Sequence, residues 1–125
     1  MATKATILCV DDHQDTRILL TCLLAQNQYG VMVSGNVAEA LVLAERIPFD
    51  LFILDMRLPD GTGKDLCCQF KVLYPNVPVL FYSAVVEQDE IDKALQAGGS
   101  DYLRKPVSVA DFQDAVTRLL SADES

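Results

Sequence analysis

Short apolar segments that alternate with amphipathic stretches constrain the fold of this chain more than any other feature of its sequence. Five such segments, at 6–10, 31–34, 51–54, 77–82 and 101–103, are bounded by polar or turn-forming residues. They lack the regular polar alternation of a half-exposed strand, which is typical of strands that are covered on both faces of a sheet. We therefore expect five buried strands.

The stretches that follow these segments carry apolar residues at helical spacing, as amphipathic helices do. The stretch 89–97 has the narrowest apolar face, and it completes a set of five expected helices. The other four expected faces consist of Leu19, Leu20, Leu23 and Leu24; Val37, Ala40, Leu41 and Ala44; Leu66, Phe70 and Leu73; and Phe112, Ala115, Val116 and Leu119.

Residues that begin and end helices support this division of the chain. Asn36, Thr62 and Ser108 each precede an acidic residue by three positions, the arrangement in which a side chain caps the amino terminus of a helix. Pro48, Pro75 and the adjacent glycines at 98 and 99 fall where helices are expected to end.

Five strands that alternate with five helices predict βαβ units, and hence a parallel sheet with helices on both faces. This arrangement is the doubly wound α/β fold. The chain of 125 residues has the length of one domain, so we expect a single domain over 1–125 with a frayed polar tail at 121–125. In such sheets, ligands bind beyond the carboxyl ends of the strands.

The composition argues against several classes of function. A net charge of −8, without clustered Lys and Arg, argues against direct binding of nucleic acid. No apolar run approaches the ~20 residues of a membrane span, and no secretory signal precedes the first strand, so we expect a cytoplasmic protein. The four cysteines form neither a zinc motif nor a redox motif, and we expect them to be buried as small apolar residues.

Polar side chains follow four of the five expected strands, at the end where ligands bind. Two carboxylates about 5 Å apart repel by about 3 kcal/mol at an effective dielectric constant of about 20, so a group of three calls for a cation. Oxygen ligands suit Mg²⁺. A carboxylate in such a site can attack phosphorus and form an aspartyl phosphate, with a lysine to balance the charge. The side chains are Asp11, Asp12, Asp55, Ser83, Arg104 and Lys105.

In this order, the motifs resemble those of the receiver domains of two-component response regulators. The resemblance covers about residues 6–120, and it implies the strand order 2-1-3-4-5 of flavodoxin-like sheets. The matching features are Asp11-Asp12 after the first strand, the segment Asp-Met-Arg-Leu-Pro-Asp-Gly that begins at Asp55, Ser83-Ala84 after the fourth strand, Tyr102 and Lys105-Pro106.

The resemblance implies a phosphoacceptor and a metal site. Asp55 would accept the phosphoryl group. Mg²⁺ would be held by Asp12, Asp55 and the backbone carbonyl of Arg57, while Asp11 would act largely through a metal-bound water. The positions two after the phosphoacceptor and two after the hydroxyl residue affect the lifetime of the phosphoryl group in such domains. These positions hold Arg57 and Val85 here, which leaves the lifetime open.

The resemblance also implies a phosphoryl-binding group and a switch. The Ser83 hydroxyl, the backbone N–H of Ala84 and the Lys105 ammonium would bind phosphoryl oxygens, and Tyr102 would turn inward after Ser83 moves. These movements would change the surface of the fourth helix, fifth strand and fifth helix. The peptide bond between Lys105 and Pro106 is expected to be cis, which proline makes accessible.

A receiver of this kind is a signalling switch that catalyses only its own phosphorylation and dephosphorylation. The resemblance implies that a sensor histidine kinase or a histidine phosphotransfer protein supplies the phosphoryl group. The output would be a downstream protein partner, or an output domain outside this chain. The sequence does not identify the kinase, the output or the oligomeric state.

Simpler interpretations exist for individual residues. Asp12 could cap the first helix, with Asp15 three positions later, although its acidic neighbours favour a metal site. His13 is expected to be an unremarkable exposed residue in the first turn of that helix. Tyr102 could be an ordinary half-buried aromatic residue of its strand.

Two other functions compete with the signalling switch. A phosphate-independent interaction module could retain the fold and the acidic residues without accepting phosphate. An aspartate-nucleophile phosphatase usually carries a second acid two residues after the nucleophile, and Arg57 occupies that position here. A flavin carrier is disfavoured because no hydroxyl-rich loop for the flavin phosphate follows the first strand.

Overall fold

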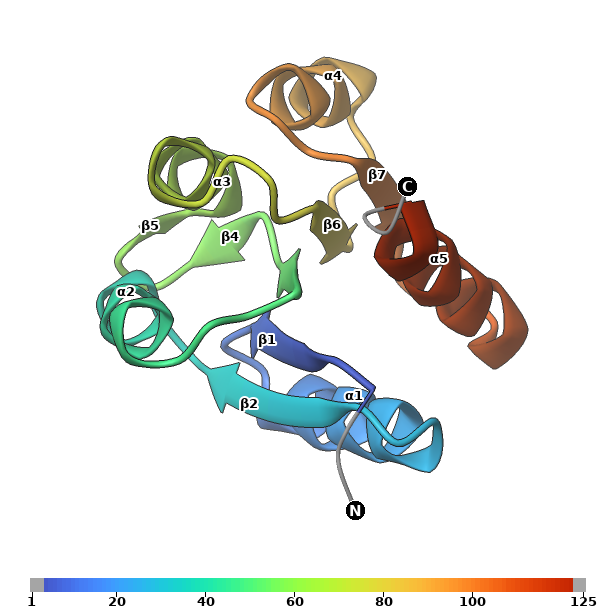
Figure 1. Cartoon of the computed structure of the whole chain (residues 1–125). Helices are drawn as coiled ribbons and strands as arrows, with labels where there is room; N and C mark the ends of the chain where they lie inside the picture. Colours follow the sequence, from blue (N-terminus) through green and yellow to red (C-terminus); the bar gives the residue numbers. More distant parts are fainter. Residues whose placement is uncertain (1–3, 123–125) are drawn as a thin grey trace.

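Five parallel strands form the central sheet, in the order β2-β1-β3-β6-β7 (Figure 1). The computed structural model describes residues 4–122. Numbered along the chain within this sheet, the order is 2-1-3-4-5, so the predicted doubly wound fold and strand order are confirmed. The strands of the sheet are β1 (Thr6–Val10), β2 (Gly30–Ser34), β3 (Leu51–Leu54), β6 (Val79–Ser83) and β7 (Asp101–Arg104).

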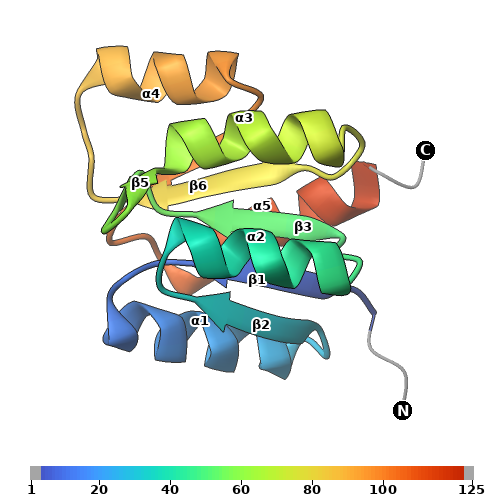
Figure 2. The ribbon, with the colours of Figure 1, turned by 90° about the vertical axis from the view of Figure 1, so that its left-hand side faces the viewer.

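Within residues 4–122, five helices cover the sheet, as the sequence predicts. The two hydrophobic clusters show that α1 and α5 pack on one face, whereas α2, α3 and α4 pack on the other (Figures 1 and 2). The fourth expected helix, at 89–97, is present with similar bounds. The helices are α1 (Gln14–Gln26), α2 (Val37–Arg46), α3 (Gly63–Leu73), α4 (Gln88–Gln96) and α5 (Val109–Ala122).

The alternation of side chains along β1 separates the two halves of the core. Ile7 and Cys9 join the cluster beneath α1 and α5, whereas Leu8 and Val10 join the cluster beneath the other three helices. All four side chains are buried, because successive residues of a strand point to opposite faces and both faces are covered here.

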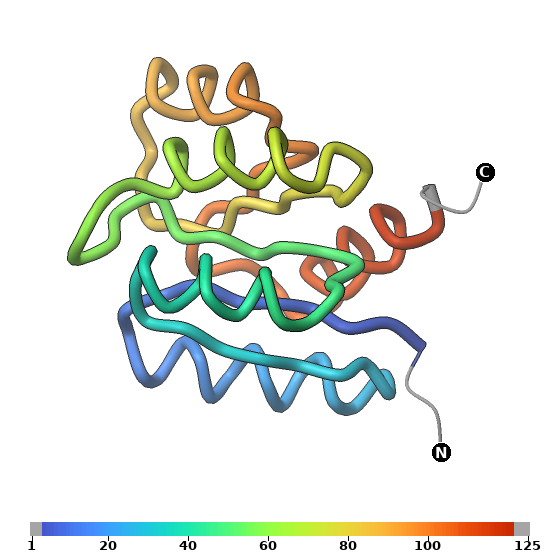
Figure 3. The backbone as a smooth tube through the Cα atoms, turned by 60° about the vertical axis from the view of Figure 1, so that its left-hand side comes forward, coloured from blue at the N-terminus to red at the C-terminus, as the bar shows by residue number. Residues whose placement is uncertain are grey.

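A two-stranded hairpin interrupts the expected alternation between β3 and α3. Its strands, β4 (Arg57–Leu58) and β5 (Gly61–Thr62), pair in antiparallel fashion. The hairpin projects from the edge of the domain where the main strands end (Figure 3). The sequence analysis did not predict it, because two residues are too few to carry a strand pattern.

Two of the expected apolar helix faces are narrower than predicted. Leu19 is 47% exposed, because Leu20 and Leu24 already form the buried side of α1. Leu73 is 54% exposed. The apolar residues of α3 continue instead from Phe70 to Tyr74, which is partly buried against the core and follows at helical spacing.

The predicted helix caps are all present. The Asn36 side chain accepts a hydrogen bond from the backbone N–H of Glu39 at 2.8 Å. Thr62 accepts one from Asp65 at 3.1 Å. The Ser108 hydroxyl accepts one in the same way from the residue three positions later, at 3.0 Å. These caps fix where α2, α3 and α5 begin.

The cysteines divide into two pairs. Cys9 and Cys67 are buried as expected, and burial raises the pKa of their thiols to about 12 and about 11 respectively. Cys22 and Cys68 are exposed, so the prediction of burial is wrong for them. Both lie on outward-facing sides of their helices.

The remaining expectations concern membranes and the end of the chain. Each helix within residues 4–122 is too short or too polar to cross a lipid bilayer. Helix α5 includes residues 121 and 122, where the frayed tail was expected to begin, and residues 123–125 lie outside the described part of the chain.

Candidate functional site

The carboxyl ends of the five parallel strands lie along one edge of the sheet (Figure 2). The residues that follow these ends surround a cleft of about 410 Å³. The cleft unites most of the side chains that the sequence analysis selected from separate strands. Its lining consists of Asp12, His13, Asp55, Arg57, Ser83, Ala84, Val85, Val86, Glu87 and Lys105.

Asp11 and Asp55 are buried at the floor of this edge, with exposed fractions of 2% and 5%. The backbone N–H of Asp11 donates to Ser34 at 2.9 Å, and that of Asp55 donates to Val10 at 2.9 Å. One carboxylate oxygen of Asp55 also accepts from the backbone N–H of Met56 at 2.7 Å. These bonds extend the sheet and hold both carboxyl groups in defined positions.

Lys105 lies between the two buried carboxylates. Its Nζ is 2.6 Å from Oδ2 of Asp11 and 3.3 Å from Oδ2 of Asp55. Burial by itself lowers the pKa of Lys105, but its hydrogen bond to Asp11 and the charges of Asp55 and Asp11 raise it above the ordinary 10.5. Lys105 therefore remains an ammonium ion at neutral pH, and it offsets part of the negative charge of the site.

The aromatic ring of Tyr82 lies beneath the ammonium group of Lys105. The distance from Nζ to the ring centroid is 5.4 Å, within the range of a cation–π contact. Tyr82 in turn packs on Phe112 of α5, with ring centroids 5.8 Å apart. The sequence analysis did not select Tyr82, because nothing in its local pattern distinguishes it from an ordinary residue of a buried strand.

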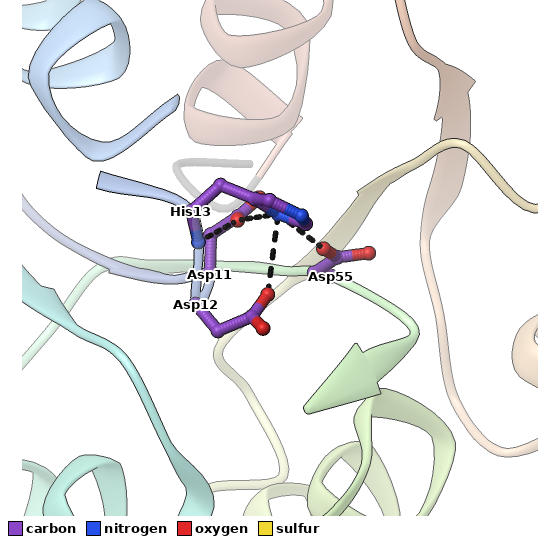
Figure 4. Close-up of side chains that lie close together, drawn as sticks. All are labelled: Asp11, Asp12, His13 and Asp55. Atoms are coloured by element: carbon purple, nitrogen blue, oxygen red, sulfur yellow. Dashed lines mark hydrogen bonds and ion pairs between the residues drawn. The ribbon is translucent and has the colours of Figure 1, made fainter. Parts of the chain in front are cut away.

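His13 also belongs to the acidic cluster (Figure 4). Its Nδ1 lies 3.0 Å from Oδ1 of Asp11, 3.2 Å from Oδ1 of Asp12 and 3.9 Å from Oδ2 of Asp55. His13 is exposed, as expected, but its position among these acids was not expected. It is the N-cap residue of α1, and its ring turns toward the acids of the cleft. The alternative in which Asp12 caps this helix is wrong for the same reason.

The acids of the cluster can supply oxygen ligands to a hard cation. One ligand atom each from Asp11, Asp12, His13 and Asp55 lie within 4.8 Å of one another. Such a group of carboxylates is typical of Mg²⁺ sites in proteins. Arg57 lies at the mouth of the cleft, where its side chain is exposed.

The opposite side of the cleft is formed by the loop that follows β6. Ser83 is 1% exposed, and its hydroxyl oxygen accepts a hydrogen bond from the backbone N–H of Val85 at 3.3 Å. Ala84, between them, is exposed to solvent. Ser83 and Ala84 therefore line the same cleft as Asp55.

Tyr102 lies behind this loop, on β7. Its hydroxyl group donates to the backbone carbonyl of Val85 at 2.7 Å, and its ring stacks on Phe81 with centroids 6.1 Å apart. Burial raises the pKa of Tyr102 above the ordinary 10.0. The ring thus already occupies an inward position in this structure, bonded to the loop that carries Ser83, whereas the resemblance implies that it turns inward only after Ser83 moves. The peptide bond between Lys105 and Pro106 is cis, as the family resemblance implies.

Gly63 supports Asp55 from below, although the sequence analysis did not select it. A Cβ atom at this position would lie 2.0 Å from the backbone carbonyl oxygen of Asp55. The backbone N–H of Gly63 also donates to Met56 at 2.8 Å. The first residue of α3 must therefore lack a side chain so that the chain can pass closely under the aspartate.

Asp60, at the tip of the hairpin, has a structural role that the sequence analysis also missed. Its carboxylate accepts hydrogen bonds from the backbone N–H groups of Val37 and Ala38, at 2.7 and 3.0 Å. These bonds lower the pKa of Asp60 below its ordinary 3.8. The hairpin next to Asp55 is thereby attached to the amino terminus of α2.

Comparison with known proteins agrees with this geometry. The family model described as "Response regulator receiver domain" matches residues 7–117. The response regulator protein PilR of Pseudomonas aeruginosa is 40% identical over 118 residues, which are 94% of this chain and 26% of that protein. The transcriptional regulatory protein CreB of Escherichia coli is 34% identical over 119 residues, 94% of this chain and 51% of that protein. The chain thus spans a quarter to a half of these relatives.

Solved structures give the same result. A two-component response regulator from Clostridium difficile superposes with a TM-score of 0.93 at 27% identity, over 98% of this chain and 100% of that chain. The non-phosphorylated HemR receiver domain from Leptospira biflexa superposes with a TM-score of 0.87 at 31% identity, over 94% of this chain and 95% of that chain.

Proposed function

This chain belongs to the response regulator receiver family, whose members are two-component signalling modules rather than classical enzymes, and from that premise we propose that Asp55 accepts a phosphoryl group. The observation that carries the proposal is the setting of Asp55. Its carboxylate is buried at the floor of the cleft, 3.3 Å from the Lys105 ammonium and close to two further carboxylates. A nucleophilic carboxylate in such a polar, preorganised site can attack phosphorus.

The proposed transfer has three parts. An oxygen of Asp55 forms a bond to the phosphorus of a phosphohistidine, the bond between phosphorus and imidazole nitrogen breaks, and the imidazole leaves with the bonding electrons. Lys105, which contacts Asp11 and Asp55 in the structure, exchanges one of these contacts for a phosphoryl oxygen. The Ser83 hydroxyl and the backbone N–H of Ala84 bind the other oxygens, in charge-assisted hydrogen bonds.

Mg²⁺ is the cofactor that this proposal requires. Asp12, Asp55 and the backbone carbonyl of Arg57 would hold it, and Asp11 would contribute through a bound water. When bound, the ion neutralises charge on the phosphoryl oxygens during transfer. The clustering of the three carboxylates supports this assignment, since they would otherwise repel one another in a largely buried site.

The phosphoryl group would act as a switch through the loop after β6. Ser83 would exchange its 3.3 Å contact with Val85 for a phosphoryl oxygen, which draws the loop toward Asp55. Tyr102 holds the carbonyl of Val85, so movement of the loop is transmitted to β7. The surface of α4, β7 and α5 would then change, because the phosphoryl group makes contacts in one arrangement that it lacks in the other.

The partners follow from this chemistry. A sensor histidine kinase or a histidine phosphotransfer protein would donate the phosphoryl group, and a downstream protein or an output domain would respond to the changed surface. Arg57, exposed at the cleft mouth, would influence how fast water removes the phosphoryl group from Asp55. The same residue disfavours the phosphatase alternative, which usually carries an acid at its position.

Nuclear magnetic resonance with beryllium fluoride, a phosphoryl mimic, tests the proposal. We expect Mg²⁺ with beryllium fluoride to shift the backbone signals of Ser83, Tyr102 and Lys105 in the wild type and in Asp65→Asn, a control that removes an exposed acid on α3. Asp55→Asn should give no such shifts. A silent wild type, or an equal response from Asp55→Asn, would overturn the proposal and favour a phosphate-independent interaction module.

A further inference from the structure

We propose that His13 supplies a nitrogen ligand to the cation site of the cleft, so that this site binds transition metal ions such as Ni²⁺ and Cu²⁺ more tightly than its carboxylates alone would. The inference rests on the cation site of the proposed function and deepens it. The observation behind it is that the imidazole Nδ1 lies among three carboxylate oxygens from two different strand ends.

The three distances from the His13 Nδ1 match those between atoms of one ligand shell. Around an octahedral ion with bonds of about 2.1 Å, neighbouring ligand atoms are about 3.0 Å apart and opposite ones about 4.2 Å apart. The Nδ1 of His13 is 3.0 Å from an oxygen of Asp11 and 3.2 Å from one of Asp12, which are distances of neighbouring ligands. Its 3.9 Å separation from Asp55 is close to that of opposite ligands.

The local backbone holds the ring in this position. His13 is the N-cap residue of α1, with extended backbone angles that direct its side chain back toward the end of β1. Its backbone N–H donates to Oδ1 of Asp11 at 2.9 Å, the same oxygen that Nδ1 contacts. The side chain is 65% exposed, so water can reach the cluster and complete a coordination shell.

A simple surface ion pair explains the arrangement less well. An exposed pair between His13 and one acid would contribute only about 0 to 1 kcal/mol and would need a single partner. Here the ring nitrogen approaches three carboxylates, two of which are buried. The carboxylate oxygens that surround Nδ1 are themselves typical metal ligands, so a cation can bind Nδ1 and these oxygens together.

Ligand chemistry then predicts a selectivity. Imidazole nitrogen suits Ni²⁺, Zn²⁺ and Cu²⁺, whereas Mg²⁺ prefers oxygen and gains little from nitrogen. His13 should therefore raise the affinity for Ni²⁺ and leave the affinity for Mg²⁺ nearly unchanged. The chain holds a single histidine, so any imidazole bound to a metal in the untagged protein must come from this residue.

Two measurements on the untagged chain test the inference, with His13→Ala and His13→Asn as variants. In the wild type loaded with Cu²⁺, electron spin echo modulation should contain the signature of imidazole nitrogen, and both variants should lack it. In calorimetric titrations, both variants should lose on the order of tenfold or more in Ni²⁺ affinity and less than about twofold in Mg²⁺ affinity. His13→Asn retains a side chain suited to an N-cap, which separates loss of the imidazole from damage to the helix.

The inference is overturned if the wild type shows no nitrogen modulation, if it binds neither ion, or if the variants lose Ni²⁺ and Mg²⁺ affinity equally. The beryllium fluoride response separates this failure from failure of the proposed function. A wild type that responds to beryllium fluoride but lacks nitrogen modulation contradicts only the role of His13. A wild type with nitrogen modulation and no beryllium fluoride response contradicts only the phosphoacceptor role of Asp55.

Discussion

The two sides of the cleft differ in how firmly they are held. On the acid side, Asp11 and Asp55 are buried and attached to the sheet by backbone hydrogen bonds of 2.9 Å. On the loop side, the Ser83 hydroxyl accepts a 3.3 Å hydrogen bond from the backbone N–H of Val85 and contacts the Tyr102 hydroxyl, which bonds the Val85 carbonyl at 2.7 Å, and Ala84 is exposed. The acids are thus fixed by backbone bonds of the sheet, whereas the Ser83 hydroxyl and the loop after it are held through side-chain hydrogen bonds that can be exchanged.

Lys105 connects these two sides. It extends from the end of β7, on the loop side, to the carboxylates of β1 and β3. Its bonds neutralise charge on the acid side, and its position depends on the same strand that carries Tyr102. A switch requires a rigid region that holds the charged ligand and a second region that changes its position when the ligand binds.

Gly63→Ala should lower the free energy of unfolding more than any other substitution considered, because it disturbs the acid side of the cleft. The new Cβ would lie 2.0 Å from the backbone oxygen of Asp55. Neither the backbone at residue 63 nor that at Asp55 can move away without disturbing α3 or the sheet. We expect a loss of about 3 kcal/mol in the free energy of unfolding, measured with urea, together with loss of the beryllium fluoride response.

Gly61→Ala is the matched control, two residues away in the hairpin. Its Cβ would approach only a terminal methyl group of Val37, at 3.2 Å, and that side chain can adjust. We expect a change within about 0.5 kcal/mol. Equal effects of the two substitutions would contradict a special close contact beneath Asp55.

Lys105→Met should remove the contact that links the loop side of the cleft to its carboxylates. It leaves two buried carboxylates without their ammonium partner, and we expect the free energy of unfolding to fall by about 2 kcal/mol in the absence of divalent cations. Mg²⁺ should restore part of this loss, since it supplies positive charge to the same carboxylates. Lys93→Met, which removes an exposed pair with Glu90, should cost less than about 1 kcal/mol and be insensitive to Mg²⁺.

The pH dependence of the same variant gives an independent measurement. The folded-state pKa of Lys105 lies above the ordinary 10.5, so its stabilising bonds are fully present below that pH and are lost as the pH rises through the folded-state value. The stability difference between wild type and Lys105→Met should therefore be constant from neutral pH up to about pH 10 and shrink above it. A difference that grows with alkaline pH would contradict the ion pairs with Asp11 and Asp55.

Tyr102→Phe should lower stability less than Gly63→Ala or Lys105→Met does. Its effect should be confined to the loop after β6. It removes the hydrogen bond to the carbonyl of Val85, and we expect a loss of about 1 kcal/mol. Tyr74→Phe is the control, because it removes a similar bond, to Ala44, far from the cleft. Relaxation dispersion should detect greater motion of the loop at Ser83 only in the first variant; similar loop motion in both would argue against a role for Tyr102.

Much of the fold could be predicted because its signals are local. Buried strands, helix caps such as Asn36 and turn residues such as Pro75 act over a few positions, and their order implies a parallel sheet. A parallel sheet then brings Asp11, Asp55 and Lys105 to one edge, because all its strands end there. The predictions were wrong where the apolar spacing does not specify which side of a helix is buried. Leu19 and Leu73 were expected to face the core and are exposed.

Local patterns along the chain were enough to predict the fold class and the residue types gathered at the carboxyl edge of the sheet, and the family resemblance added the strand order. Three contacts became visible in the folded chain: the His13 ring lies in the acidic cluster, Gly63 passes beneath Asp55, and Tyr102 bonds to the loop after β6. Residue order specifies which strand end carries a side chain. The direction in which that side chain points, and the backbone it meets, depend on contacts between segments far apart in the chain.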